Sequence, residues 1–208
     1  MTGIGLAYPR TESLGLRSGT YLDRHRPIAP STSFMPELTY VALGANLGEP
    51  KSTFHTATLM LIRPSIRVLR RARLYSSKPV GPQDQPNFVN SMLELETTDE
   101  PSDLLAILKK TEAQLGRTKS RRWGPRIIDL DIILYGERQL ETPELTIPHR
   151  EMTRRRFVLA PLADLCPNRV VPGTGQSVAE LLSACAEDVD PLIVLENHIE
   201  MLDHERIR

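Results

Sequence analysis

The chain has 208 residues, a length that fits one folded domain with tails. Its 26 Lys and Arg residues balance 26 Asp and Glu residues, which excludes an overall charge that would attract nucleic acid or an anionic membrane. The two cysteines, Cys166 and Cys185, lack the spacing of a metal-binding motif, and we interpret them as packing residues of a cytoplasmic protein. Neither a signal peptide nor a membrane-spanning apolar run is recognisable, so neither secretion nor membrane insertion is expected.

The first 38 residues differ in composition from the rest. Residues 1–38 contain scattered Gly, Pro, Ser and Arg without a helical or strand period, which predicts a flexible N-terminal extension. Arginines among hydroxyl residues leave a transit peptide open as an alternative, which Glu12, Asp23 and the prolines weaken. The folded domain is predicted over residues 39–197, and residues 198–208 are a predicted C-terminal tail.

The first half of the predicted domain alternates strands with one helix. Residues 38–43 are an apolar, β-prone run, and after a glycine-rich turn Pro50 begins a helix that reaches about residue 63. Strands follow over residues 66–75 and 87–96, and the proline-rich loop 78–86 separates them.

The second half adds one more helix and one more strand to this core. Pro101 follows the capping candidate Asp99 and begins a helix that ends near Gly116, and residues 127–135 form the next strand. The order β-α-β-β-α-β predicts an α+β fold with a ferredoxin-like core, in which two helices cover one face of a mainly antiparallel sheet.

Beyond this core the sequence indicates three shorter elements. Helices are predicted over residues 151–165 and 177–186, and a short strand over residues 192–195.

Two acidic residues stand out in the strand that ends the core. Asp129 and Asp131 are two positions apart among apolar neighbours, so they project from one face with Cα atoms about 7 Å apart. Adjacent carboxylates in apolar surroundings need cations to offset their repulsion, and magnesium prefers carboxylate oxygen while leaving positions for substrate phosphates. Taken alone, the pattern equally favours an acid pair bridged to Arg126 for structural reasons.

A basic segment directly precedes the acid pair. Beside Trp123, within ten positions, stand Arg117, Lys119, Arg121, Arg122 and Arg126. A basic loop alone is more often a solvated surface, but next to the carboxylates this one favours a clamp for the triphosphate of ATP and its metal. Glu112 and His149 fit the same site as further contacts, or are a surface acid and a loop residue respectively.

This stretch also resembles a known family. The segment Arg122-Trp-Gly-Pro-Arg-x-x-Asp-Leu-Asp131 is similar to the signature of 6-hydroxymethyl-7,8-dihydropterin pyrophosphokinases. Gly44-Ala-Asn-Leu47 resembles the first turn of that family, residues 80–90 its pterin loop, and Ile147-Pro-His149 its C-terminal substrate segment. The resemblance covers about residues 39–195, and it implies transfer of the β,γ-diphosphate of ATP to the hydroxymethyl group of 6-hydroxymethyl-7,8-dihydropterin, giving AMP, in folate biosynthesis.

The resemblance also implies roles for individual residues. Two Mg²⁺ ions are expected at Asp129 and Asp131, which together with Arg117 and Arg126 would be catalytic. The residues implied to contact ATP are Arg117, Arg126, His149 and Arg155 at the phosphates, and Glu112, Trp123 and Ile132 around the nucleotide. The implied pterin pocket consists of Ser77, Val80, Phe88, Asn90 and Phe157. The loop before Trp123 is one residue shorter than in the familiar bacterial form, which leaves the catalytic choice among Arg117, Lys119 and Arg121 open.

Two other classes of protein are weighed against this hypothesis. A β-α-β-β-α-β sheet can bind single-stranded RNA, but the strands lack the aromatic patterns of such modules and the acid pair would repel phosphate. A nucleotidyltransferase that uses Asp-x-Asp would release pyrophosphate in place of AMP. We therefore expect a monomer whose partners are its small-molecule substrates, without a nucleic-acid or membrane partner.

Overall fold

The computed structural model describes residues 35–118, 123–185 and 191–202. The predictions for residues 1–34, for Lys119, Arg121 and Arg122, for the end of the helix at residue 186 and for residues 203–208 therefore lie outside the described part.

A mainly antiparallel sheet forms the middle of the described structure. Its strand β1 (Glu37–Ala45) pairs with β4 (Phe88–Thr97), the central strand, on one side and with β5 (Asp129–Tyr135) on the other. Two further strands, β2 (Ile66–Arg71) and β3 (Leu74–Ser77), pair with different parts of β4. The short strands β9 (Glu200–Met201) and β8 (Ile193–Glu196) extend β2 and β3, so the described sheet has seven strands.

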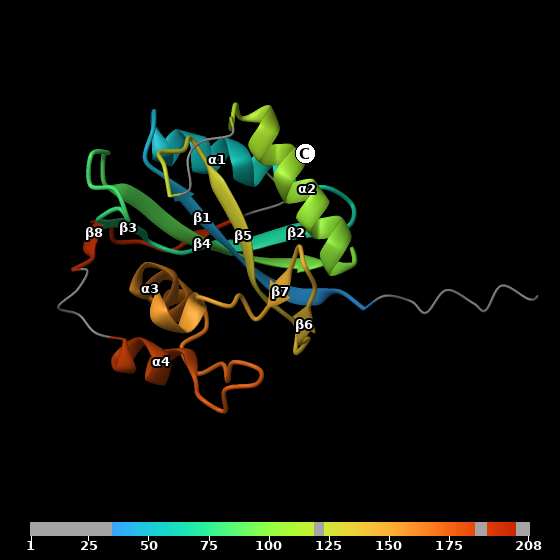
Figure 1. Cartoon of the computed structure of the whole chain (residues 1–208). Helices are drawn as coiled ribbons and strands as arrows, with labels where there is room; N and C mark the ends of the chain where they lie inside the picture. The colour runs from blue at the N-terminus through green and yellow to red at the C-terminus, as the bar shows by residue number, and fades with distance from the viewer. Residues whose placement is uncertain (1–34, 119–122, 186–190, 203–208) are drawn as a thin grey trace, which may run out of the picture. The chain divides into compact units, whose positions relative to one another are not determined.

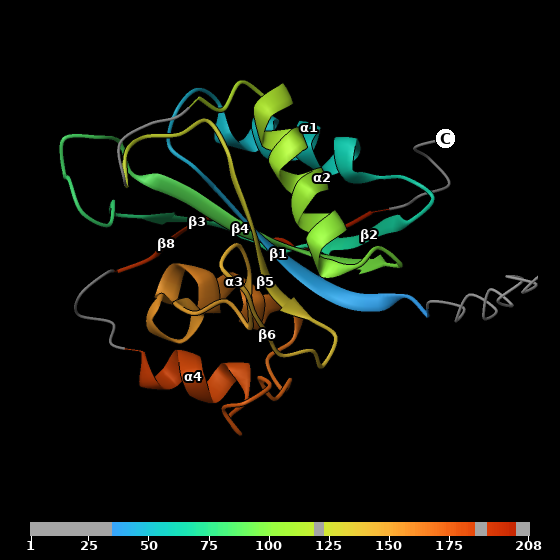
Figure 2. The same cartoon turned by 45° about the vertical axis from the view of Figure 1, so that its right-hand side comes forward.

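Helices cover both faces of this sheet (Figures 1 and 2). The helices α1 (Pro50–Leu61) and α2 (Pro101–Gln114) cover one face, as predicted, whereas α3 (Arg156–Leu165) lies on the opposite face and α4 (Val178–Ala184) packs outside α3. The predicted α+β class, with extra C-terminal helices and a short strand, is confirmed.

Strand alternation sorts the apolar residues into two cores. Val41 and Leu43 of β1 face α1 and α2, whereas Tyr40, just before them, belongs to the core under α3, against which Ala42 between them also packs. In β5 the pairing with β1 shifts by one residue between Tyr40 and Val41, so Ile133 and Leu134 both join the core under α3. The first residues of β5 keep strict alternation, which matters for the acid pair.

The helix starts follow local chemistry. Pro50 and Pro101 occupy the first positions of α1 and α2, where a missing N–H costs no hydrogen bond. The predicted cap of α2 is wrong: the residue at the cap position is Glu100, whose side chain makes no capping bond. Asp99 is occupied elsewhere, because its carboxylate accepts a 2.8 Å hydrogen bond from the Ser65 hydroxyl.

Two predicted elements are each divided in the structure. The strand predicted over residues 66–75 is interrupted at Ala72 and Arg73, because the backbone N–H and the guanidinium of Arg73 are bound by the Asp164 carboxylate of α3. The helix predicted over residues 151–165 is a 3₁₀ turn, η1 (Met152–Arg154), followed by α3. Arg155 between them is extended, with φ −117° and ψ 102°.

A small hairpin and β9 were not predicted. Within the described part of the chain, the strands β6 (Leu140–Glu141) and β7 (Thr146–Ile147) pair only with each other, and each contains two residues. A run this short has too few side chains to show a period of two.

Candidate active site

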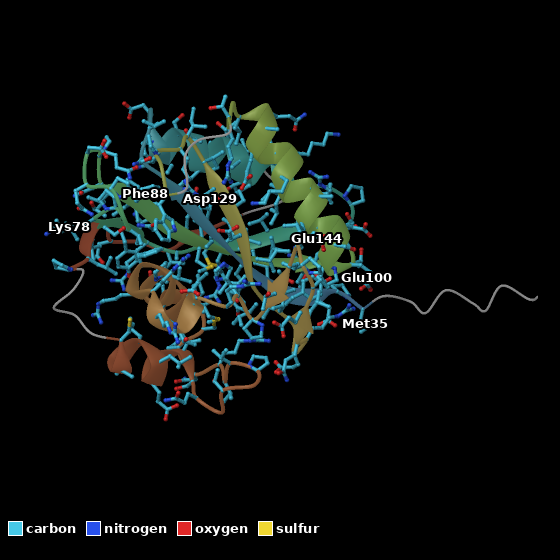
Figure 3. The ribbon with its side chains drawn as sticks, in the orientation of Figure 1. Met35, Lys78, Phe88, Glu100, Asp129 and Glu144 are labelled. Carbon is cyan, nitrogen blue, oxygen red and sulfur yellow. The ribbon has the colours of Figure 1, made fainter. Side chains whose placement is uncertain are left out.

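A pocket lies on the sheet face that carries α3. It is bordered by β1, β3, β4 and β5, by the loop after β3, and by the turn that leads into α3. Figure 3 labels Lys78, Phe88 and Asp129, which come from three of these segments and line the pocket together. Most of the predicted site residues line it, namely Ser77, Val80, Phe88, Asn90, Trp123, Arg126, Asp129, Asp131, His149, Arg155 and Phe157. Residues separated by up to 80 positions in sequence are thus brought to one place.

The acid pair reaches the pocket through the alternation of β5. Asp129 lies opposite Gly44 and Asp131 lies opposite Ala42 of β1, so both carboxylates leave the strand on the pocket side. Leu130 between them is fully buried on the other side. The prediction that the two carboxylates share one face is confirmed.

Both carboxylates are paired with cations. Asp129 binds the guanidinium groups of Arg117 and Arg126, each with an N–O distance of 2.5 Å. Asp131 lies 3.5 Å from the ammonium of Lys109. The Asp-x-Asp pattern left open a purely structural ion pair with Arg126. In the protein without ligands, Asp129 forms this ion pair.

Glu112 joins the same charge network from α2. Its carboxylate, with a side chain 4% exposed, contacts Arg117 at 2.5 Å and Lys109 at 2.9 Å, and it accepts the backbone N–H of Leu130 at 2.6 Å. Burial alone would lower the pKa of the Arg117 guanidinium, but Asp129 and Glu112 outweigh it and raise that pKa above its ordinary value. Arg117 and Glu112 therefore lie beside the pocket and support Asp129, rather than lining the pocket themselves.

Ile132 lies outside the pocket as well. Its side chain is 2% exposed and belongs to the core beneath α1 and α2. The strand alternation that turns Asp131 into the pocket turns Ile132 away from it.

His149 is held in a defined tautomer. Its Nδ1 atom accepts the backbone N–H of Glu151 at 3.2 Å, which assigns the proton of the neutral ring to Nε2. Burial lowers the pKa of the imidazole below its ordinary value, an effect that Asp131 opposes and Arg155 reinforces. A neutral His149 at pH 7 is therefore a single hydrogen-bond donor toward a ligand.

The other end of the pocket combines aromatic rings with a buried amide. Asn90 and Ser77 are 5% and 3% exposed, and the Asn90 Nδ2 atom donates to the Ser77 hydroxyl at 2.9 Å. The rings of Phe88 and Phe157 lie 6.0 Å and 5.9 Å from the guanidinium carbons of two pocket arginines, Arg126 and Arg155. This end is suited to a flat heterocycle with a polar edge.

Trp123 and the loop after β3 border the pocket entrance. Trp123 is 44% exposed and has φ 58°, in the left-handed region that a bulky side chain rarely adopts. Gly81, with φ 95°, lies against it: a Cβ atom at Gly81 would come within 3.1 Å of the Trp123 ring. The glycine therefore permits the indole to approach the loop closely.

Asn46 was not predicted as a site residue, although it holds two pocket segments together. Its Oδ1 atom accepts the N–H of Arg126 at 2.8 Å, and its Nδ2 atom donates to the side chain of Gln85 and to the carbonyl of Pro86, at 2.9 and 3.0 Å. Its own backbone N–H donates to the Arg126 carbonyl at 3.0 Å. The glycine-rich turn was recognised in the sequence, but nothing local indicates these distant partners.

Lys109 was also not predicted. In sequence it is one of two adjacent lysines on a helix, which is the ordinary pattern of a solvated face. Its position becomes significant only because α2 packs against β5.

The acid pair fits magnesium by its donor chemistry. Among the described residues, no three His, Cys, Asp or Glu side chains gather into a metal site of their own. Magnesium is commonly held by one or two carboxylates together with substrate phosphates and water, and Asp129 and Asp131 supply that number of carboxylates. Within the described ranges, no helix combines the length and apolar character needed to cross a bilayer.

The fold and the site define a class of protein, the α+β proteins whose pocket joins a carboxylate pair and arginines to aromatic rings. Comparison with known families identifies which: the family model of 7,8-dihydro-6-hydroxymethylpterin-pyrophosphokinase (HPPK) matches residues 40–167. The chain belongs to this family.

Two members of the family match this chain over most of their own length. The 2-amino-4-hydroxy-6-hydroxymethyldihydropteridine pyrophosphokinase of Pseudomonas aeruginosa is 47% identical over 152 residues, covering 73% of this chain and 93% of the relative. The Bacillus subtilis enzyme of the same name is 40% identical over 133 residues, covering 64% of this chain and 80% of the relative.

Solved structures agree on the fold. A Plasmodium falciparum HPPK-DHPS triple mutant with pteroate superposes with a TM-score of 0.59 at 15% identity, covering 83% of this chain. This chain spans about half of that longer protein, 50%.

Proposed function

We propose that the pocket between β5 and α3 is the active site at which this pyrophosphokinase transfers the β,γ-diphosphate of ATP to 6-hydroxymethyl-7,8-dihydropterin, in folate synthesis. One observation carries the assignment: the carboxylates of Asp129 and Asp131 line the same pocket as the rings of Phe88 and Phe157. A site for a metal-bound polyphosphate is thus joined to a site for a flat acceptor.

The charged end takes ATP. Asp129 and Asp131 would hold two Mg²⁺ ions, which when bound neutralise the phosphate oxygens and polarise the phosphorus. Arg126 and Arg155, which line the pocket, are placed for phosphate oxygens, and the neutral His149 donates through Nε2. Arg117 acts one step further away, because it fixes the carboxylate of Asp129.

The aromatic end takes the pterin. Phe88 and Phe157 provide apolar surface for the bicyclic ring, and Val80 and Trp123 border it. The Nδ2 hydrogens of Asn90 are directed at Ser77 and, at 3.5 Å, at the Tyr75 carbonyl. The Oδ1 atom is therefore the group that accepts a hydrogen bond from a ring N–H of the pterin. This one fixed polar atom and the two rings then orient the pterin, and with it the hydroxymethyl group.

Positioning supplies most of the rate enhancement in this proposal. The pterin hydroxyl oxygen bonds to the β-phosphorus, the bond from that phosphorus to the α,β-bridging oxygen breaks, and AMP leaves with the bridging oxygen. The hydroxyl proton is released to solvent. A strong base is not required for such a phosphoryl transfer, since arrangement in line and charge neutralisation dominate its barrier.

The reaction is tested by its nucleotide product. ATP, magnesium and the hydroxymethyl dihydropterin are incubated with the protein, and the nucleotides are separated by chromatography. AMP together with the pterin diphosphate is the expected result, whereas ADP or free pyrophosphate would refute the reaction type.

The site is tested with Asp131→Asn, which keeps the size of the side chain and removes its charge. We expect kcat to fall at least about a hundredfold, the scale on which removing one electrostatic stabiliser acts. Glu144→Gln is the matched control, because Glu144 is exposed in the loop between β6 and β7 and does not line the pocket. Near-normal turnover of Asp131→Asn under saturating magnesium would contradict the metal assignment.

Some sequence predictions stay predictions. They are the cytoplasmic location, the monomeric state without nucleic-acid or membrane partners, and the domain limits at residues 39 and 197.

A further inference from the structure

The ammonium group of Lys109 occupies a cation site of its own at the border of the active site. Its Nζ atom lies 2.9 Å from Glu112 Oε1, 3.0 Å from the Leu130 carbonyl oxygen and 3.5 Å from Asp131 Oδ1. An ammonium has three hydrogens to donate, and three oxygens surround this one. The first contact stays within α2, the second reaches the backbone of β5, and the third reaches the acid pair.

Among the described residues, the charges that are directly ion-paired around the acid pair and Glu112 cancel. Three carboxylates, those of Glu112, Asp129 and Asp131, meet three cations, those of Lys109, Arg117 and Arg126. A site with equal numbers of positive and negative charges has no excess field to attract a free divalent cation. A metal ion that arrives alone must therefore displace a resident cation from its carboxylate.

The three resident cations are not equally easy to displace. Arg117 and Arg126 bind Asp129 at 2.5 Å, and their side chains are 27% and 18% exposed. Lys109 reaches Asp131 at 3.5 Å, with both side chains more than 40% exposed. The contact between Lys109 and Asp131 is the longest and most solvated of the set, and Glu112 and Leu130 would retain the ammonium nearby if it moved.

We propose that Lys109 is a positioning residue that serves as the exchangeable counter-ion of Asp131 and makes magnesium binding depend on ATP. In the free protein the ammonium holds the carboxylate in place and competes with metal ions. ATP brings the negative charge that the neutral site lacks, so metal and nucleotide bind together. The inference rests on the proposed function, because it takes Asp131 to be a metal ligand.

The test measures metal binding without nucleotide and without turnover. Mn²⁺, which accepts the same oxygen ligands, is titrated into the full chain, and free Mn²⁺ is followed by electron paramagnetic resonance. Lys109→Met should tighten nucleotide-free Mn²⁺ binding about two- to fivefold, the scale of a partly solvated ion pair. Lys110→Met is the matched control, since it removes the same charge from an exposed neighbour on α2 and should leave the affinity unchanged.

Two more variants locate the effect. Lys109→Gln removes the charge but keeps a hydrogen-bond donor, so it should reproduce the tightening even if the methionine variant folds poorly. Adding Asp131→Asn to Lys109→Met should abolish the gain. Equal Mn²⁺ affinity of wild type and both Lys109 variants, or equal gains in Lys110→Met, would overturn the proposal.

Failure of the metal assignment gives a different result. If wild type binds no additional Mn²⁺ when a nonhydrolysable ATP analogue is present, Asp131 is not a metal ligand and the proposed function loses its metal site. If Mn²⁺ binds with the analogue but the Lys109 variants behave as wild type without it, only the role of Lys109 is refuted.

Discussion

The guanidinium group of Arg117 is shared by two acids from different elements. It lies 2.5 Å from Glu112 of α2 and 2.5 Å from Asp129 of β5. A nearly buried carboxylate that loses its partner retains its desolvation cost without compensation. The side chain of Glu112 is 4% exposed, so Arg117 is as important to the fold as to the site.

Arg117→Met should therefore lower both stability and activity. We expect the free energy of unfolding to fall by about 1 to 3 kcal/mol, because Glu112 and Asp129 each lose one of two cations. Urea denaturation measures the stability, and kcat is measured under conditions where the variant is folded. Arg117→Lys should recover more stability than activity, since an ammonium cannot bridge two carboxylates with planar geometry. Unchanged stability of Arg117→Met would show that the bridge contributes nothing.

Cys166 is predicted from its surroundings to be chemically inert at neutral pH. Burial raises the pKa of its thiol to about 11, and the Sγ atom donates to the Leu162 carbonyl. The thiolate is the reactive form, and the raised pKa keeps the thiol protonated until the pH approaches that value. At pH 8, about one Cys166 side chain in a thousand is therefore a thiolate.

Alkylation measures this directly. Iodoacetamide labelling of the folded protein, followed by mass spectrometry of the Cys166 peptide, should be slow at pH 8 and rise steeply toward pH 11. The same peptide in urea is the control for intrinsic reactivity. Labelling in the folded protein at pH 8 as fast as in urea would contradict the expectation.

At the scale of elements, the site depends on how strand ends and loops are joined. Asn46 follows β1 and binds the segment before β5 as well as the loop before β4. All three segments carry pocket residues, and the side chain that joins them is 5% exposed.

Asn46→Ala should loosen these segments together. We expect a loss of about 2 kcal/mol in unfolding free energy, because buried backbone groups lose their partners, and a rise in KM for both substrates. Asn46→Asp keeps the acceptor for the Arg126 N–H but loses the donors toward the loop, so it should impair pterin binding more than ATP binding. A change in only kcat for Asn46→Ala would argue against a positioning role.

At the scale of the whole molecule, the two helical layers have different tasks. The layer of α1 and α2 completes one core, whereas the opposite layer places Arg155 and Phe157 in the pocket through the start of α3 (Figure 2). A substitution that destabilises the layer of α3 should therefore weaken pterin binding, whereas one that destabilises the layer of α1 and α2 should not.

Leu159→Ala and Leu61→Ala separate these tasks, since both side chains are fully buried but lie in different cores. Each should cost about 2 to 5 kcal/mol of stability by leaving a cavity. Only Leu159→Ala, on α3, should also weaken pterin binding, measured by fluorescence titration on the folded fraction. Equal loss of pterin affinity in Leu61→Ala would mean that stability alone governs the site.

The sequence by itself determined the order and type of the main elements, because their signals are local. Prolines at the first helical positions predicted the starts of α1 and α2, and alternation predicted that Asp129 and Asp131 share a face. The motif from residue 122 to 131 predicted the family, which the comparisons confirm.

Only the tertiary structure decided which distant groups meet. Asp164 of α3 binds Arg73 and interrupts a strand that the local sequence favours. Lys109 resembles any solvated helix lysine until α2 packs beside β5 and places its ammonium near Asp131. Such contacts depend on the three-dimensional arrangement of segments that are far apart in the chain, and no local period or propensity encodes that arrangement.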